Sequence, residues 1–172
     1  MVQSARHPLR LNVGFLLHQG VGASRDFEFD LPEVTVAVDL TVRRLQGTLR
    51  LSRTAQGLYA QGALQAAAPV ECVRCLEGFE QPLSIEVADL FLYPAPPESD
   101  PALRIPETAQ LDLSPLLREY LMLGLPMRPV CRADCQGLCP ACGVNRNHTS
   151  CDHPAAGLDP RLSALSSLLS ES

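Results

Sequence analysis

The sequence predicts an α+β protein that consists mostly of antiparallel β-strands, arranged as a sandwich or an open barrel, followed by a cysteine-rich C-terminal module and short helices. Three observations lead to this prediction. Apolar and polar residues alternate in successive segments of the first half of the chain. A proline-rich segment then separates these segments from two short helical patterns. Most of the cysteines lie between the two helical patterns.

The strand prediction rests on an alternation of period two. Residues 25–31 read Arg-Asp-Phe-Glu-Phe-Asp-Leu, which is typical of a half-buried strand. In residues 34–39, three valines alternate with polar or small residues. Further strands are expected at 47–53, 57–66 and 82–93. Since turn-forming Gln-Gly pairs precede two of them, the pattern favours an antiparallel meander.

The proline-rich segment divides the chain. Residues 94–106 contain five prolines together with Glu98, Ser99 and Asp100, a composition that predicts a mobile linker or a long loop. We therefore expect a β-rich body over residues 1–93 and a linker over residues 94–110. The third part, residues 111–172, would hold the helices and most of the cysteines.

Two proline-led signals predict the helices. Ser114 and Pro115 provide an N-cap and a proline at the first helical position, and Gly124 ends the helix before Pro126. The expected apolar face consists of Leu116, Leu117, Tyr120, Leu121 and Met122. Asp159 and Pro160 begin the second helix in the same way. Its apolar stripe consists of Leu162, Leu165, Leu168 and Leu169, and we expect both stripes to dock onto the body.

Composition argues against several classes of protein. The chain has 172 residues and a net charge of -5, and all fourteen of its basic residues are arginines. This acidic balance argues against a simple polyanion binder and favours a basic partner. No apolar run approaches the roughly 18 residues that cross a bilayer, and the first residues do not have the pattern of a signal peptide. We therefore expect a cytoplasmic protein with no membrane partner and with cysteines in a reducing compartment.

The strongest signal is the spacing of the cysteines. Between Cys131 and His153 the chain reads Cys-x3-Cys-x3-Cys-x2-Cys-x8-Cys-x-His, so six potential metal ligands lie within 23 residues. A separate Cys-x2-Cys pair, Cys72 and Cys75, lies upstream. Zinc prefers four such ligands in a tetrahedron, and a Cys-x2-Cys turn lets two thiolates converge on one ion. Residues 138–143 have the form of a zinc knuckle, in which Gly143 allows the backbone geometry that the turn requires.

The number of ligands predicts two sites. Seven cysteines and one histidine make eight ligands, enough for two zinc ions. The solution with the shortest loops places Cys139, Cys142, Cys151 and His153 on one ion, and Cys72, Cys75, Cys131 and Cys135 on the other. The second set would connect the β body to the C-terminal zinc-binding module. His148 is the alternative to His153, but its polar loop favours solvation or hydrogen bonding.

Other functions suit these residues less well. Disulfides fit poorly with an odd number of cysteines, and a thioredoxin-like pair at Cys72 and Cys75 would need a βαβ unit. No arrangement of nucleophile, acid–base pair or open metal position indicates an enzyme or a small-molecule substrate. Arg74, Arg128 and Arg132 flank the cysteines and would contact RNA phosphates or balance the charge of the thiolates.

Three sequence runs carry a resemblance to a known family. They are Glu71–Phe79, Leu125–Cys131 and Asp134–Asn145, and they resemble the bacterial YceD family of large ribosomal RNA subunit accumulation proteins. Gly22–Phe29 is similar to the family's N-terminal strand, and Asp159–Leu169 to its C-terminal helix. Many relatives end the ligand set in Cys-x-Cys, whereas this chain has Cys151-Asp152-His153. His153 would thus be a substitute ligand, or the site would have three ligands.

The resemblance implies a function. It implies an accessory factor for the synthesis, processing or stability of large-subunit ribosomal RNA, with no assigned reaction. It also favours the pairing of Cys72 and Cys75 with Cys131 and Cys135. The implied partner is a large-subunit rRNA precursor or a basic ribosomal protein. The alternative is a thiol-based redox protein or a zinc-responsive regulator.

Overall fold

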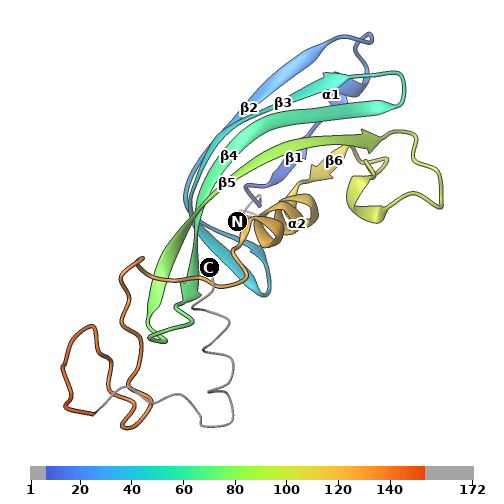
Figure 1. Ribbon diagram of the computed structural model, residues 1–172. Helices are drawn as coiled ribbons and strands as arrows, with labels where there is room; N and C mark the ends of the chain where they lie inside the picture. The colour runs from blue at the N-terminus through green and yellow to red at the C-terminus, as the bar shows by residue number, and fades with distance from the viewer. Residues whose placement is uncertain (1–6, 154–172) are drawn as a thin grey trace, which may run out of the picture.

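Four long strands form one curved antiparallel sheet that dominates the molecule (Figure 1). The computed structural model describes residues 7–153. The strands are β2 (Ser24–Ala37), β3 (Leu40–Arg53), β4 (Gly57–Glu71) and β5 (Gly78–Leu92). Each strand pairs with the next one in the chain, so the predicted antiparallel meander is confirmed.

The strands are longer than the sequence patterns indicated. The segments predicted at 25–31 and 34–39 are parts of β2, and Pro32 is tolerated between them because β2 lies at the edge of the sheet. Strand β3 begins at Leu40 rather than at residue 47. Its pairing with β4 shifts register between Arg43 and Gln46, and Arg44 has a φ of 52°. This bulge interrupts the alternation that marks a strand.

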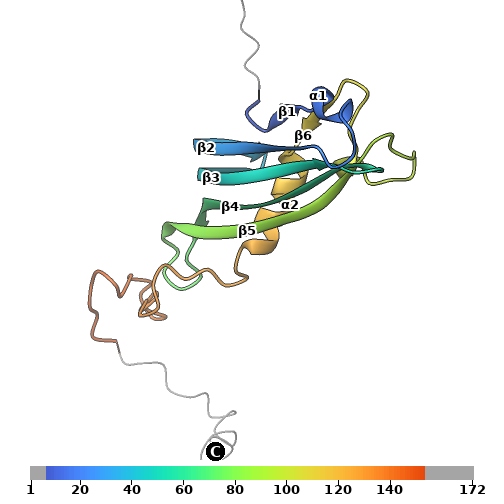
Figure 2. The ribbon, with the colours of Figure 1, turned by 90° about the horizontal axis from the view of Figure 1, so that it is seen from above.

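Smaller elements cover one face of the sheet. Strands β1 (Arg10–Asn12) and β6 (Gln110–Asp112) form a separate two-stranded antiparallel sheet, and α1 (Gly14–Leu17) follows β1. Helix α2 (Ser114–Gly124) runs across the strands and contacts β5 and β2 (Figure 2). The mostly antiparallel α+β class is thus confirmed, with α2 and the small sheet on the face where a sandwich has its second large sheet.

Helix α2 follows the prediction closely. It ends at Gly124, has proline in its first turn, and buries Leu116, Leu117 and Leu121 in the main core. Two details differ. Met122 is 46% exposed and does not belong to the buried face. Ser114 is the first residue of the helix instead of its N-cap. The backbone N–H of Ser114 donates a hydrogen bond of 2.9 Å to the side chain of Asp112.

The proline-rich segment packs back against the end of β5. It contains the short 3-10 helix η1 (Pro101–Leu103), and buried Ile105 donates its N–H to the Leu92 carbonyl at 3.1 Å. The guanidinium of Arg104 donates to the carbonyls of Pro97 and Ser99. The helix predicted after Asp159 lies outside the described residues. Within residues 7–153, no helix combines the length and the apolar character needed to cross a membrane.

Candidate metal centres

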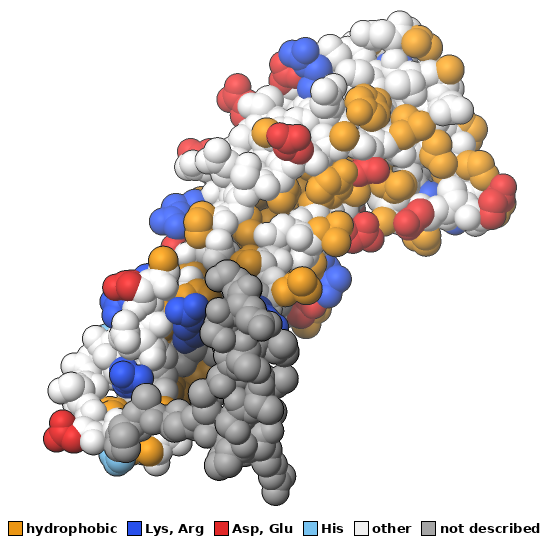
Figure 3. Space-filling model, viewed as in Figure 1, with side chains coloured by type: hydrophobic (Ala, Val, Ile, Leu, Met, Phe, Trp, Pro, Cys, Tyr) orange, Lys and Arg blue, Asp and Glu red, His pale blue; other side chains and the backbone are white. Residues whose placement is uncertain are grey.

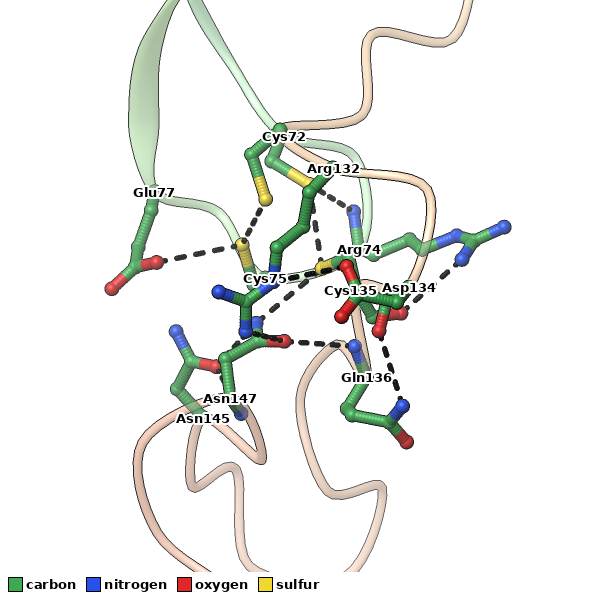
Figure 4. Close-up of polar contacts among 11 residues, drawn as sticks. Cys72, Arg74, Cys75, Glu77, Arg132, Asp134, Cys135, Gln136, Asn145 and Asn147 are labelled. Atoms are coloured by element: carbon green, nitrogen blue, oxygen red, sulfur yellow. Dashed lines mark hydrogen bonds and ion pairs between the residues drawn. The ribbon is translucent and has the colours of Figure 1, made fainter.

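The first cysteine pair lies in the turn between β4 and β5, at the opposite end of the sheet from η1 (Figure 1). Cys72 follows β4 directly, and its backbone N–H donates to the Glu77 carbonyl at 2.9 Å. Leu76 donates its N–H to the Cys72 carbonyl at 2.9 Å and has a φ of 59°. These two hydrogen bonds close a compact loop that orients Cys72 and Cys75 toward the same point (Figure 4).

The chain returns to this turn after α2. Val73 donates its N–H to the Pro129 carbonyl at 2.9 Å, which aligns the segment before Cys131 with the turn. The sulfurs of Cys72 and Cys135 are 3.8 Å apart, and those of Cys75 and Cys131 are 3.7 Å apart. All four sulfurs lie within 4.8 Å of one another. We call this set, Cys72, Cys75, Cys131 and Cys135, the inner cluster.

The inner cluster has dimensions suited to zinc. A tetrahedral ion with Zn–S bonds of about 2.3 Å has sulfur–sulfur edges of about 3.8 Å. Cys72, Cys75 and Cys135 are at most 5% exposed, and they form a small buried cluster apart from the main core, beside Phe79 and Val130. The donor set, spacing and burial all fit a structural metal ion.

The ionisation of these thiols also favours a cation. Burial opposes ionisation of Cys72, but hydrogen bonds from the backbone amides of Cys131, Cys75 and Arg74 outweigh it and lower the pKa to about 6. The Glu77 backbone amide favours the Cys75 thiolate, yet burial and the neighbouring sulfurs raise the pKa of Cys75 to about 12. Four thiolates so close together need a compensating positive charge, which a divalent cation supplies.

The second set of ligand atoms lies nearby and is more exposed. One ligand atom from each of Cys139, Cys142, Cys151 and His153 falls within 4.8 Å of the others. Cys139 is buried, whereas Cys142 and His153 are exposed. We call this set the outer cluster. Hydrogen bonds from the amides of Cys142 and Ala141 lower the pKa of Cys139 to about 6.

The knuckle of the outer cluster has the expected backbone geometry. Gly143 has a φ of 73° and donates its N–H to the Cys139 carbonyl at 2.8 Å. Cys139 in turn donates its N–H to the Val144 carbonyl at 2.8 Å. A residue with a side chain would be strained at this φ, which explains the glycine.

The other residues selected from the sequence have different neighbours. His148, the alternative ligand, lies 2.6 Å from Glu77 instead of joining the outer cluster. Arg74 donates to the Cys135 carbonyl at 3.2 Å. Arg132 donates to the Asn147 side chain at 2.9 Å. Among the described residues, the exposed Arg128 has no ion pair or side-chain hydrogen bond.

Sequence reasoning missed two polar side chains beside the inner cluster. Asn147 donates an amide N–H to the Cys135 sulfur at 3.4 Å, and Glu77 lies 3.7 Å from the Cys75 sulfur (Figure 4). The only signal available was a pair of asparagines, Asn145 and Asn147, within a polar loop. Such loops are usually solvated, so the pattern alone did not indicate contact with a cysteine.

Comparisons with known proteins agree on one family. The model of the YceD family, described as large ribosomal RNA subunit accumulation protein YceD, matches residues 60–169. An uncharacterised protein of Mycobacterium tuberculosis is 31% identical over 98% of this chain and 80% of its own length. The uncharacterised protein YlbN of Bacillus subtilis is 28% identical over 58% of this chain and 59% of its own length.

A further relative carries the same description as the family. It is a chloroplastic large ribosomal RNA subunit accumulation protein homologue of Arabidopsis thaliana, 34% identical over 27% of this chain and 15% of its own length. No solved structure matches the chain.

Proposed function

Since the chain belongs to the YceD family of large ribosomal RNA subunit accumulation proteins, we propose that it is a zinc-binding accessory factor in the biogenesis of the large ribosomal subunit. The observation that carries the proposal is the inner cluster. Its four sulfurs come from two segments far apart in the chain and lie within 4.8 Å of one another, and the separations of 3.8 Å and 3.7 Å match the edge of a zinc tetrahedron. An ion there would fix residues 125–153 against the β4–β5 turn.

The two clusters would hold one ion each. Cys72, Cys75, Cys131 and Cys135 would ligate the first, and Cys139, Cys142, Cys151 and His153 the second. Zinc is the metal that best suits sets of four thiolates and of three thiolates with one imidazole. The role of both ions would be structural, because each site has four protein ligands and therefore no open position.

Arg128, which is exposed and unpaired among the described residues, supports contact with RNA at this end of the molecule. In the body, five arginines form ion pairs with carboxylates: Arg10, Arg43, Arg44, Arg50 and Arg118. Arg53 and Arg104 donate to backbone carbonyls. Near the clusters, Arg132 pairs with Asp134 at 3.4 Å, whereas Arg128 has no such partner among the described residues; on the body the same is true of Arg25. Figure 3 shows basic side chains at the surface of this end of the molecule.

These contacts rank the three candidate arginines. Arg74 and Arg132 hold parts of the module together, so their charge also serves the fold. Arg128 is exposed and unpaired among residues 7–153, so it is the principal candidate for contact with large-subunit rRNA. The acidic body, over residues 1–124, carries the net charge of -5 and would instead suit a basic ribosomal protein.

Metal content tests the first part of the proposal. We expect the reduced, chelator-free protein to contain about two zinc ions per chain, measured by elemental analysis. A value near zero would remove the structural role of the clusters and leave a thiol-based redox function as the alternative.

Ribosome profiles test the second part. Cells depleted of the protein should accumulate fewer mature large subunits relative to small subunits, together with unprocessed or degraded large-subunit rRNA. Crosslinking with ultraviolet light should recover large-subunit rRNA with the wild-type protein. A normal subunit ratio with normal precursor RNA would contradict the assembly role, whatever the metal content.

A further inference from the structure

We infer that Asn147 couples the two metal sites, so that filling the outer cluster strengthens metal binding by the inner cluster. This inference rests on the proposed occupancy of both clusters. It assigns Asn147 as a positioning residue: its amide contacts a sulfur of the inner cluster, but its position depends on the loop that the outer cluster closes.

The side chain of Asn147 uses its full capacity for hydrogen bonds. Its Oδ1 accepts from the Arg132 guanidinium at 2.9 Å and from the Gln136 backbone N–H at 2.8 Å. Its Nδ2 donates to the Cys135 sulfur at 3.4 Å and to Asn145 Oδ1 at 2.8 Å (Figure 4). Because an amide offers two acceptor positions and two donor hydrogens, these four partners define its orientation. The N–H must face the sulfur.

The loop that carries Asn147 begins and ends at ligands of the outer cluster. Asn147 lies in the segment between Cys142 and Cys151, so two outer ligands bracket it. Within that segment, the backbone N–H of Asn147 donates to Asn145 Oδ1 at 3.0 Å. The backbone N–H of Arg146 donates to the Gly137 carbonyl at 2.9 Å.

His148 and Thr149 also donate their backbone N–H groups to the Asn145 carbonyl at 3.1 Å, and His148 contacts Glu77 at 2.6 Å. These bonds shape the loop, and the outer ligands Cys142 and Cys151 fix where its two ends lie. When the four outer ligands converge, the loop is closed and the amide is held on Cys135.

The contact matters chemically because Cys135 would bind the inner ion as a thiolate. An N–H donor to a thiolate sulfur disperses its negative charge and restricts its direction. Loss of a partner of this kind costs roughly 10–100-fold in metal affinity. Arg132, bound to the other end of the same amide, adds a positive charge near the site.

A double-mutant cycle tests the coupling. Cobalt(II) titrations of the full chain report the inner site, because the d–d absorption of a four-sulfur site differs from that of a site with three sulfurs and one nitrogen. We expect Asn147→Ala, which keeps all eight ligands, to weaken cobalt binding at the inner cluster by about tenfold or more. Cys142→Ser, which disables the exposed outer cluster, should have a similar effect. The double variant should be no weaker than either single variant.

Two further variants sharpen the assignment. Asn147→Asp keeps an acceptor for Arg132 and Gln136 but loses the N–H that faces Cys135, so inner-site affinity should also fall. Thr149→Ala is the matched control, and this variant should bind cobalt as the wild type does. Thr149 is an exposed residue of the same loop, and among the described residues its one hydrogen bond runs from its backbone N–H to the Asn145 carbonyl.

The outcomes are distinct. Wild-type inner affinity in Asn147→Ala or Asn147→Asp would overturn the coupling while leaving the two metal sites intact. Additive losses in the double variant would also overturn it, because the two clusters would then act independently. A wild-type protein that takes up no metal would contradict the metal sites themselves, and with them this inference.

Discussion

The sheet body and the cysteine module are stabilised by different means. In the body, alternating apolar residues of four strands pack against α2 and form one continuous core. Between Leu125 and His153 the described chain contains no helix or multi-residue strand, and its buried centre consists mainly of cysteine sulfurs. Burial of apolar surface acts without a cofactor, whereas converging thiols repel one another once ionised. The body should therefore fold without metal, and the module should not.

Removal of one ligand of the inner cluster should have the largest effect on the cysteine module. If the module stayed folded without that ligand, the two regions would not be stabilised by different means. We expect Cys72→Ser to lower the metal content from about two ions to about one per chain, because the inner cluster then has three thiols. Residues 125–153 should become sensitive to protease, while the far-ultraviolet circular dichroism of the sheet persists. Elemental analysis and limited proteolysis measure both effects.

The matched control is Cys142→Ser, which removes an exposed ligand of the outer cluster. It should also lose about one ion, but in excess zinc the weakened inner cluster should still fill, so the contact between the module and the β4–β5 turn should remain. If Cys72→Ser unfolded the sheet as well, the separation between body and module would be wrong.

A cavity in the core of the body should lower the stability of the sheet without changing the metal content. Leu64 is fully buried in β4, and we expect Leu64→Ala to lower the free energy of unfolding by about 2–5 kcal/mol. Its metal content should equal that of the wild type, because Leu64 belongs to the main core alone. Urea unfolding followed by circular dichroism gives the first quantity. A loss of metal in this variant would mean that the two regions fold together.

An arginine near the clusters should matter more for RNA than one on the body. We expect Arg128→Ala to weaken binding to large-subunit rRNA and to reduce the slope of log affinity against log salt by about one unit. Arg25→Ala on β2 is the control, since Arg25 is also exposed and unpaired among the described residues. Filter binding at several salt concentrations compares the two. Equal effects would indicate that RNA binds without preference for the module.

The smallest expected effect is the pH dependence of the stability that Asp112 gives to the body. Burial raises the pKa of Asp112, but hydrogen bonds from Ser114 and the Arg10 guanidinium outweigh it and leave the pKa below the usual 3.8. The ionised carboxylate thus contributes stability above that pH, and the contribution is lost as the pH falls through the lowered pKa.

Thermal unfolding of Asp112→Asn tests whether the ionised carboxylate stabilises the fold. The variant should unfold at a lower temperature than the wild type near pH 6, and the difference should shrink as the pH falls below 3.8 through the lowered pKa of Asp112. A difference that stays constant over this range would show that the charge of Asp112 is not responsible.

The sequence patterns best predicted the features that depend on residues close together in the chain. The Cys-x2-Cys pairs and their loops led to the same two groups of four ligand atoms that the fold brings together, and alternation identified the strands of the sheet. That zinc occupies these groups stays a prediction. Helix α2 was also located, because proline and glycine mark its ends.

Features that depend on distant residues were not predictable in this way. Strands β1 and β6 are three residues each and pair across about a hundred positions, so neither carries a periodic pattern. The continuity of β2 through Pro32 depends on its place at the sheet edge. The contact of Asn147 with Cys135 depends on how two loops fold against each other, which no local pattern describes.

The length of the β4–β5 hairpin determines how far the molecule can reach. Each strand has 15 residues, a contour of about 50 Å at the usual rise per residue. The clusters lie at one tip of this hairpin, and η1 with the proline-rich loop lies near the other end (Figure 1). The clusters and the proline-rich loop thus lie at separate ends of one curved sheet, and the length of the hairpin determines the spacing between these two surfaces.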